Sequence, residues 1–144
     1  MNMGRMTESY GRIFGLNQDQ ALDMARQTKG YSYAFQVLGY YTWKYRNDPT
    51  RIQAEYKQHL EEYVYEKIWQ ELSGEDRRVA WGVAMTPGGE VSAVRELLQM
   101  NSNSFTTYRT RLIRKGILNG DQYGVVRFEL PLFDRFVIEN YQME

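Results

Sequence analysis

The sequence contains no cysteine, and only three of its 144 residues are proline. Without cysteine the chain forms no disulfide and offers no thiolate to a metal, a composition that fits an intracellular, cytoplasmic protein. Lysine plus arginine and aspartate plus glutamate each number 18, so the formal net charge is zero. Such a chain exerts no general attraction on nucleic acid, and DNA binding has to come from a local basic patch.

Long hydrophobic runs are also missing. No apolar stretch approaches the roughly 18 residues of a membrane span, and the N-terminal residues lack the apolar core of a signal peptide. We therefore expect no membrane partner. With 42% hydrophobic and 25% charged residues, the composition is that of a folded chain. Its length suits one compact domain or two small ones.

The first half of the chain shows helical periodicity. We expect a short helix between Thr7 and Phe14, a helix capped by Asn17 that runs to about residue 28, a helix over 33–45, and a long helix over 52–72. Apolar side chains recur every three or four residues along the long helix and predict one buried stripe. These residues are Ile52, Tyr56, Leu60, Tyr63, Val64, Ile68 and Leu72. We place the domain boundary between residues 71 and 72, which gives domains 1–71 and 72–144.

The second half combines helices with short strands. Ser73 is expected to cap a helix, and Ser92 a second, shorter one. The turn Asn101-Ser102-Asn103 caps a third helix from about Ser104 to Lys115. Strands are expected at residues 90–91, 117–118 and 125–130, and a last helix is expected to start at Pro131. This is the order of a winged helix-turn-helix domain. The predicted fold class is therefore mainly α, a helical subdomain followed by a winged helix-turn-helix domain with a small β-hairpin.

The helix over 104–115 carries the candidate DNA site. Phe105, Tyr108, Leu112 and Ile113 are expected to anchor one side of it. The other side presents hydroxyls and cations without any acid, which suits the major groove of double-stranded DNA. Its N-terminal backbone amides suit a phosphate. The candidate DNA-binding residues are Ser104, Thr106, Thr107, Arg109, Thr110, Arg111, Arg114, Lys115 and, in the wing, Arg127.

A second interpretation of the same helix stays open. Basic helix faces are often only solvated surface, and acids such as Glu75, Asp76 and Glu90 offset the cations of this domain. Neutralisation of phosphates by cations supplies much of the affinity for DNA, so these acids are expected to weaken DNA binding. The alternative function is a protein-interaction or autoinhibitory winged-helix module that does not bind DNA.

A stretch of the first half resembles a known ATPase element. The run from Thr28 to Gly39, TKGYSYAFQVLG, resembles the helical lid of AAA-type ATPases of the STAND class, the signalling and archaeal-type NTPases. Gly30-Tyr31-Ser32 matches the Gly-x-Pro turn of that lid, with Ser32 in place of proline. Lid helices, a long helix and a winged helix ending in Arg111–Gly116 resemble the C-terminal part of such ATPases.

The resemblance implies a lid-like subdomain in residues 1–71. It places Gly30, Tyr31 and Ser32 beside the adenine nucleotide, ATP or ADP, when an ATPase core is joined. That core, in the same or a companion chain, is the implied protein partner. We expect the chain to be a C-terminal fragment of a longer ATPase, or a split product that works beside one.

Residues for catalysis are not assembled in the sequence. No Gly-x-x-x-x-Gly-Lys-Ser/Thr phosphate loop is present, so we expect no cofactor in this chain and no ATPase activity. Ser102 and Ser104 have no neighbouring histidine to activate them. His59 is the only histidine, and we expect it on a solvated helix face rather than in a metal site. The sequence thus predicts a non-catalytic protein.

Overall fold

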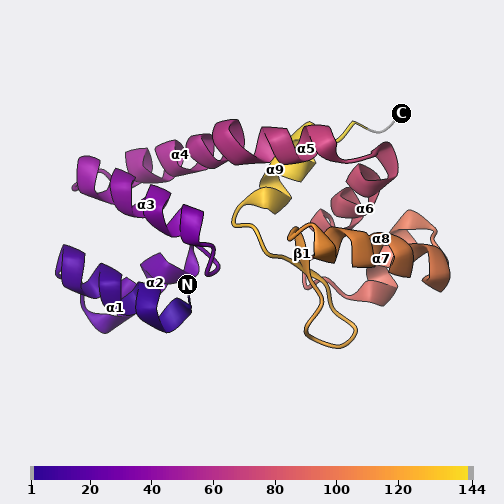
Figure 1. Ribbon diagram of the computed structural model, residues 1–144, viewed down its shortest axis with the longest axis horizontal. Helices are drawn as coiled ribbons and strands as arrows, with labels where there is room; N and C mark the ends of the chain where they lie inside the picture. The colour runs from indigo at the N-terminus through magenta and orange to yellow at the C-terminus, as the bar shows by residue number, and fades with distance from the viewer. Residues whose placement is uncertain (1, 143–144) are drawn as a thin grey trace. The chain divides into compact units, whose positions relative to one another are not determined.

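The computed structural model describes residues 2–142 and is mainly helical, with one small antiparallel sheet, which confirms the predicted fold class. The chain divides into two compact units, unit 1 from Met1 to Val64 and unit 2 from Tyr65 to Glu144 (Figure 1). This division lies about two helical turns before the boundary expected from the sequence. The reason is that Tyr65 and Trp69 belong to the second core, where their rings pack at 5.0 Å from Phe133 and 6.0 Å from Phe136.

Unit 1 consists of two helical pairs. Its helices are α1 (Met3–Phe14), α2 (Gln18–Arg26), α3 (Ser32–Lys44) and α4 (Pro49–Leu60). Helix α1 packs on α2 and α3 on α4, and α1 also contacts α3. The prediction that the first helix follows Thr7 was wrong, because Asn2 accepts a hydrogen bond from the Arg5 amide and starts the helix earlier. Asn17 caps α2 as predicted, in a capping box with Gln20.

Two buried tyrosines organise the core of unit 1. The Tyr10 ring stacks on Phe35 at 4.4 Å, and its hydroxyl donates to the Phe35 carbonyl at 2.6 Å. The Tyr56 hydroxyl donates to the Gln27 carbonyl at 3.0 Å. Burial raises the pKa of both hydroxyls above the ordinary 10.0, because a phenolate loses its hydration there.

A π-helical turn interrupts the long helix. Segment η1 (Glu61–Tyr65) follows α4 and is followed by α5 (Glu66–Glu71). The apolar stripe predicted over 52–72 holds at Tyr56, Leu60 and Leu72 but is interrupted between them, since Tyr63 is exposed and Tyr65 is buried instead. A π turn adds a residue to the helical repeat, so every later side chain rotates relative to an uninterrupted α-helix.

Unit 2 is built around one central helix. Its further helices are α6 (Gly74–Ala84), α7 (Val91–Leu98), α8 (Ser102–Arg114) and α9 (Phe133–Asn140). Helix α6 contacts α7, α8 and α9. Ser73 caps α6 as predicted, in a capping box with Asp76. Gly82 allows α7 to approach closely, because a Cβ at that position would meet the Leu98 side chain at 2.7 Å.

A short hairpin follows α8. Strands β1 (Leu118–Asn119) and β2 (Arg127–Phe128) pair antiparallel, so the strands predicted at 117–118 and 125–130 are shifted and shortened. The strand predicted at 90–91 is reduced to one antiparallel bridge between Glu90 and Val125. Ser92 was wrongly predicted as a helix cap, because Glu90 is the extended residue that precedes α7.

The last helix begins later than predicted. Leu132 lies in the left-handed region, at φ 62°, so α9 starts at Phe133 rather than at Pro131. Phe133, Phe136 and Val137 are buried and close the core of unit 2. Within residues 2–142, no helix combines the length and apolar character needed to cross a membrane.

Candidate nucleic-acid interface

Helix α8 has one buried side and one exposed side. Asn101 caps it by accepting a hydrogen bond from the Ser104 amide at 2.8 Å. Phe105 and Leu112 are fully buried, as predicted, while Tyr108 and Ile113 are only half-buried. The helix sequence from Ser102 to Arg114 contains no acid. Its exposed side therefore carries only neutral polar and cationic groups.

Most of the predicted DNA-binding residues share this exposed surface. Arg109 and Thr110 are half-buried, whereas the other predicted positions are exposed. The exposed positions are Ser104, Thr106, Thr107, Arg111, Arg114, Lys115 and, on β2, Arg127. The Thr107 hydroxyl donates to the Asn103 carbonyl of its own helix at 3.2 Å.

Arg111 is tied to the protein interior despite its exposure. Its Nη2 donates to Oδ2 of Asp76 at 3.0 Å, and Asp76 is only 1% exposed. The same oxygen accepts from the Ser73 amide, whereas Oδ1 accepts no hydrogen bond from the described residues. A buried carboxylate is costly unless it is paired. Arg111 therefore neutralises a charge on α6, a role that the sequence prediction missed.

Arg109 also has a structural partner. Its Nη2 donates to the Gly120 carbonyl at 3.1 Å, which connects α8 to the hairpin loop. A Cβ at position 120 would collide with this guanidinium group, so the contact depends on glycine. Two of the four predicted cations of α8 and its C-terminal cap thus stabilise unit 2.

Arg114, Lys115 and Arg127 form the remaining set of predicted cations. All three are exposed, and within residues 2–142 they form no hydrogen bond or ion pair with other side chains. Arg114 and Lys115 lie at the C-terminal end of α8, and Arg127 pairs with Asn119 across the hairpin. Tyr123, in the loop between the strands, is completely exposed. These side chains are available to a ligand without breaking an internal contact.

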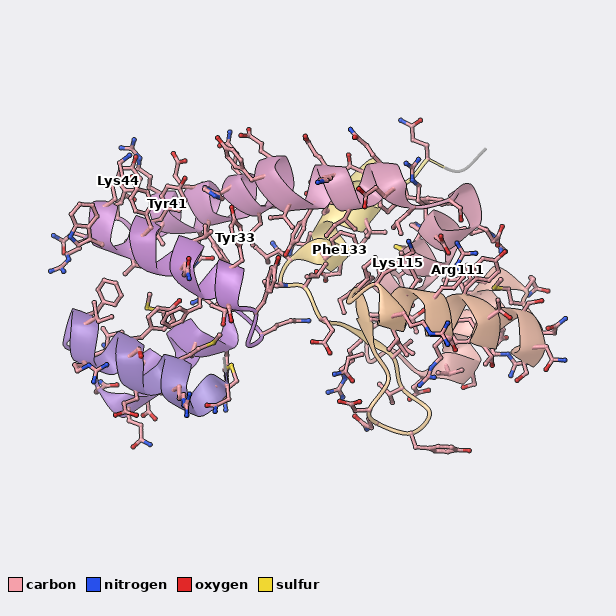
Figure 2. The ribbon with its side chains drawn as sticks, viewed as in Figure 1. Tyr33, Tyr41, Lys44, Arg111, Lys115 and Phe133 are labelled. Atoms are coloured by element: carbon pink, nitrogen blue, oxygen red, sulfur yellow. The ribbon has the colours of Figure 1, made fainter. Side chains whose placement is uncertain are left out.

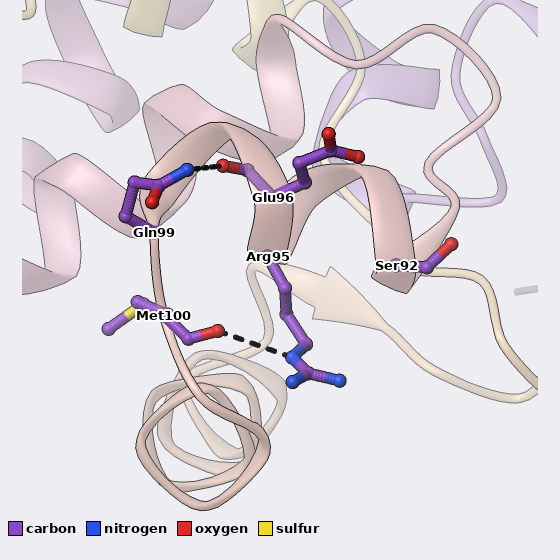
Figure 3. Close-up of a pocket in the computed structure, with 5 residues that line it drawn as sticks. All are labelled: Ser92, Arg95, Glu96, Gln99 and Met100. Carbon is purple, nitrogen blue, oxygen red and sulfur yellow. Dashed lines mark hydrogen bonds between the residues drawn. The ribbon is translucent and has the colours of Figure 1, made fainter.

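A shallow pocket lies on α7, beside the turn into α8 (Figure 3). Ser92, Arg95, Glu96, Gln99 and Met100 line about 380 Å³ of open space. Nε of Arg95 donates to the Met100 carbonyl at 3.4 Å, and the Gln99 amide donates to the Glu96 carbonyl at 2.8 Å. Arg95 was not among the residues predicted from the sequence.

The positions expected to adjoin a nucleotide lie at the start of α3. Gly30 adopts φ 75°, Tyr31 is the residue before the helix, and Ser32 is its first residue. The Tyr31 amide donates to the Thr28 carbonyl at 2.9 Å. Burial, and then the neighbouring Tyr33, raises the pKa of Tyr31. Gly30 and Tyr31 are half-buried, and Ser32 is exposed.

His59 differs from the solvated residue expected from the sequence. It is half-buried, and both ring nitrogens meet tyrosine hydroxyls, Nε2 with Tyr33 at 2.9 Å and Nδ1 with Tyr41 at 3.0 Å. The ring also packs on Tyr63 at 4.6 Å. In the part of the chain that the structure describes, no three histidine, aspartate or glutamate side chains gather as metal ligands would.

Fold and surface together define a mainly helical protein with a small hairpin and an acid-free helix exposed on unit 2. The chain belongs to the family described as Domain of unknown function (DUF8462), whose model matches residues 62–137. The match covers the end of the long helix, α6 to α8, the hairpin and most of α9. Comparisons with curated proteins and with solved structures gave no match.

Proposed function

We propose that unit 2 is a winged-helix module that binds double-stranded DNA through α8. The observation that carries the proposal is the exposed side of α8, where hydroxyls and cations gather without an acid and end in Arg114 and Lys115. Helix, extended residue, helix, turn, helix and hairpin follow one another as in winged helix-turn-helix proteins.

The chemistry of this side suits a major groove. Short hydroxyls at Thr106 and Thr107 contact base edges or methyl groups, and Arg114 and Lys115 bind phosphates or guanine. The capped N-terminus of α8 presents backbone amides to a phosphate. Arg127 and the exposed Tyr123 extend the surface along the hairpin. Arg95, in the pocket on α7, adds a phosphate contact beside the helix-turn-helix.

The test is a salt titration of duplex binding by the full chain. Arg114→Gln with Lys115→Gln weakens binding about tenfold at low salt, and flattens the slope of log K against log salt by about 1.8. Arg135→Gln is the matched control, because Arg135 is also exposed but lies on α9. Unchanged duplex affinity in the double variant, or the same loss in the control, would contradict the proposal.

The first half supports a wider assignment. By its resemblance to STAND ATPase lids, the chain is a non-catalytic C-terminal region that works with an ATPase core of the same or a companion chain. The nucleotide then belongs to that core, and Gly30, Tyr31 and Ser32 adjoin it. A chain without cysteine fits action in the cytoplasm.

A protein-interaction or autoinhibitory module is the second candidate. Residues 72–144 hold as many acids as cations, and Arg109 and Arg111 already have internal partners. Under this alternative the full chain associates with the ATPase core, and duplex DNA shows no salt-sensitive binding. The same titration, run with the core protein in place of DNA, separates the two functions.

A further inference from the structure

Unit 1 exposes a group of aromatic and cationic side chains where α3 ends and α4 begins. We call it the aromatic–cation patch; its members are Tyr40, Trp43, Lys44, Tyr45, Arg46 and Arg51. Trp43 is 61% exposed and Tyr40 is 49% exposed. Their ring centroids lie 6.2 Å apart, with the two ring planes tilted by 39°, so the two aromatic side chains are neighbours on the surface. Large exposed aromatic groups of this kind mark binding surfaces more often than single exposed residues do.

Two cations of the patch, Lys44 and Arg51, lie over its tyrosine rings, and Arg46 lies over Phe14 of α1. Lys44 Nζ lies 5.7 Å from the Tyr40 centroid and 5.3 Å from that of Tyr45, and Arg51 lies 4.0 Å from Tyr45. A hydrogen bond to Tyr45 raises the pKa of Lys44 above its ordinary 10.5. Figure 2 shows Lys44 at the end of α3, beyond Tyr41.

The local charge is positive. Between Tyr40 and Glu55 the sequence holds three cations, Lys44, Arg46 and Arg51, against two acids, Asp48 and Glu55. Asp48 accepts a hydrogen bond from the Arg51 amide and caps α4. The patch therefore attracts anions, although the whole chain has no net charge.

We propose that the aromatic–cation patch binds single-stranded nucleic acid. Unpaired bases stack on Trp43 and Tyr40, while Lys44, Arg46 and Arg51 contact the backbone phosphates. Bases in a duplex are already stacked on one another, so rings on a convex helix surface do not reach them. An apolar protein surface is a poorer occupant, since it would bury three cations without compensating charge.

The test measures anisotropy of labelled oligothymidylate and oligouridylate with the full chain at several salt concentrations. The chain carries Arg114→Gln and Lys115→Gln, so that α8 does not contribute. Binding is retained in this background, and adding Trp43→Ala weakens it about 5- to 100-fold for the preferred strand. Comparing DNA with RNA identifies that strand. Ile13→Ala is the control, because Ile13 is 60% exposed in the same unit and is not part of the patch.

A second variant is used if Trp43→Ala unfolds, as judged by loss of the helical circular dichroism signal. Lys44→Gln with Arg46→Gln flattens the salt slope by about 1.4, while Arg12→Gln, an exposed cation on α1, changes it little. The proposal is overturned if neither strand binds, if Ile13→Ala matches Trp43→Ala, or if the Arg114/Lys115 background alone abolishes binding. Binding to phosphatidylserine vesicles without strand binding, or a dimer dissolved by Trp43→Ala, overturns it as well. A failure of duplex binding by α8 leaves this result unaffected.

Discussion

The four predicted cations at α8 have unequal roles. Arg111 holds the buried Asp76, and Arg109 holds the hairpin loop at Gly120. Arg114 and Lys115 are exposed, and their side chains form no hydrogen bond or ion pair with the described residues. Loss of DNA binding in an Arg111 variant would therefore be ambiguous, because the variant also leaves a buried carboxylate without its cation.

The role of Arg111 can be measured as stability. Arg111→Ala lowers the free energy of unfolding by about 1–3 kcal/mol, because the Asp76 carboxylate stays buried without its partner. Arg114→Ala, in the same helix, changes it by less than about 0.5 kcal/mol. Urea unfolding followed by circular dichroism gives both values.

A double-mutant cycle isolates the pair. With Asp76→Asn already in place, Arg111→Ala costs less, by a coupling energy of about 1 kcal/mol or more. If Arg111→Ala lowered the free energy of unfolding equally in the Asp76 and the Asp76→Asn backgrounds, the ion pair would contribute nothing to folding.

At the scale of elements, the hairpin depends on a close backbone approach. Gly89 has φ 66°, and its carbonyl accepts from the Val126 amide at 2.8 Å, next to the Glu90–Val125 bridge. A Cβ on Gly89 would collide with the Val126 carbonyl oxygen. Gly88 has φ 88° but open space around its Cβ position. Comparing alanine substitutions at the two glycines therefore distinguishes the cost of a left-handed backbone from the cost of a steric collision.

This contrast gives a prediction about the hairpin. Gly88→Ala costs about 1–2 kcal/mol of stability, the usual penalty for a left-handed alanine. Gly89→Ala costs at least about 3 kcal/mol, because the backbone at Val126 must also move away from the new methyl group. Amide exchange at Val91 and Val126 reports the loss of the bridge. Similar costs for both variants would mean that the loop adapts and that the bridge is not needed.

At the scale of the whole molecule, unit 1 and unit 2 have separate cores, and the tyrosines of unit 1 make its stability dependent on pH. In the unfolded chain Tyr10 and Tyr56 ionise near the ordinary pKa of 10.0. Burial raises both pKa values in the folded unit, so protonated hydroxyls are favoured there. Their contribution is complete below about pH 10 and is lost as the pH rises toward the folded values.

We therefore expect Tyr10 and Tyr56 to make the folded chain less stable at alkaline pH. The free energy of unfolding of the full chain falls between about pH 9 and about pH 12, in urea titrations at each pH. In Tyr10→Phe with Tyr56→Phe the fall is shallower, although stability at neutral pH drops by about 1 kcal/mol for each lost hydrogen bond. An identical pH dependence in the double variant would contradict this account.

Local signals in the sequence were enough to locate most of the helices, but they fixed the first residue of only some of them. Asn17 and Ser73 cap α2 and α6 as predicted, because a cap depends on side chains within three residues of it. The run 101–103 was predicted to cap a helix from about Ser104, whereas Asn101 is the cap and α8 begins at Ser102. The phase of the long helix beyond Leu60 was not predictable in this way. The π turn at Glu61–Tyr65 replaces Tyr63 by Tyr65 in the core, where its ring meets Phe133.

The amino-acid sequence by itself determined a mainly helical chain with a hairpin and an acid-free, cationic helix, since periodicity and composition are local properties. Only the tertiary structure decided which cations remain available to a ligand. Arg111 meets Asp76 across 35 positions of sequence, and Arg109 meets Gly120 across 11. No pattern within α8 encodes these partners, because each pairing arises from how α6, α8 and the hairpin pack together.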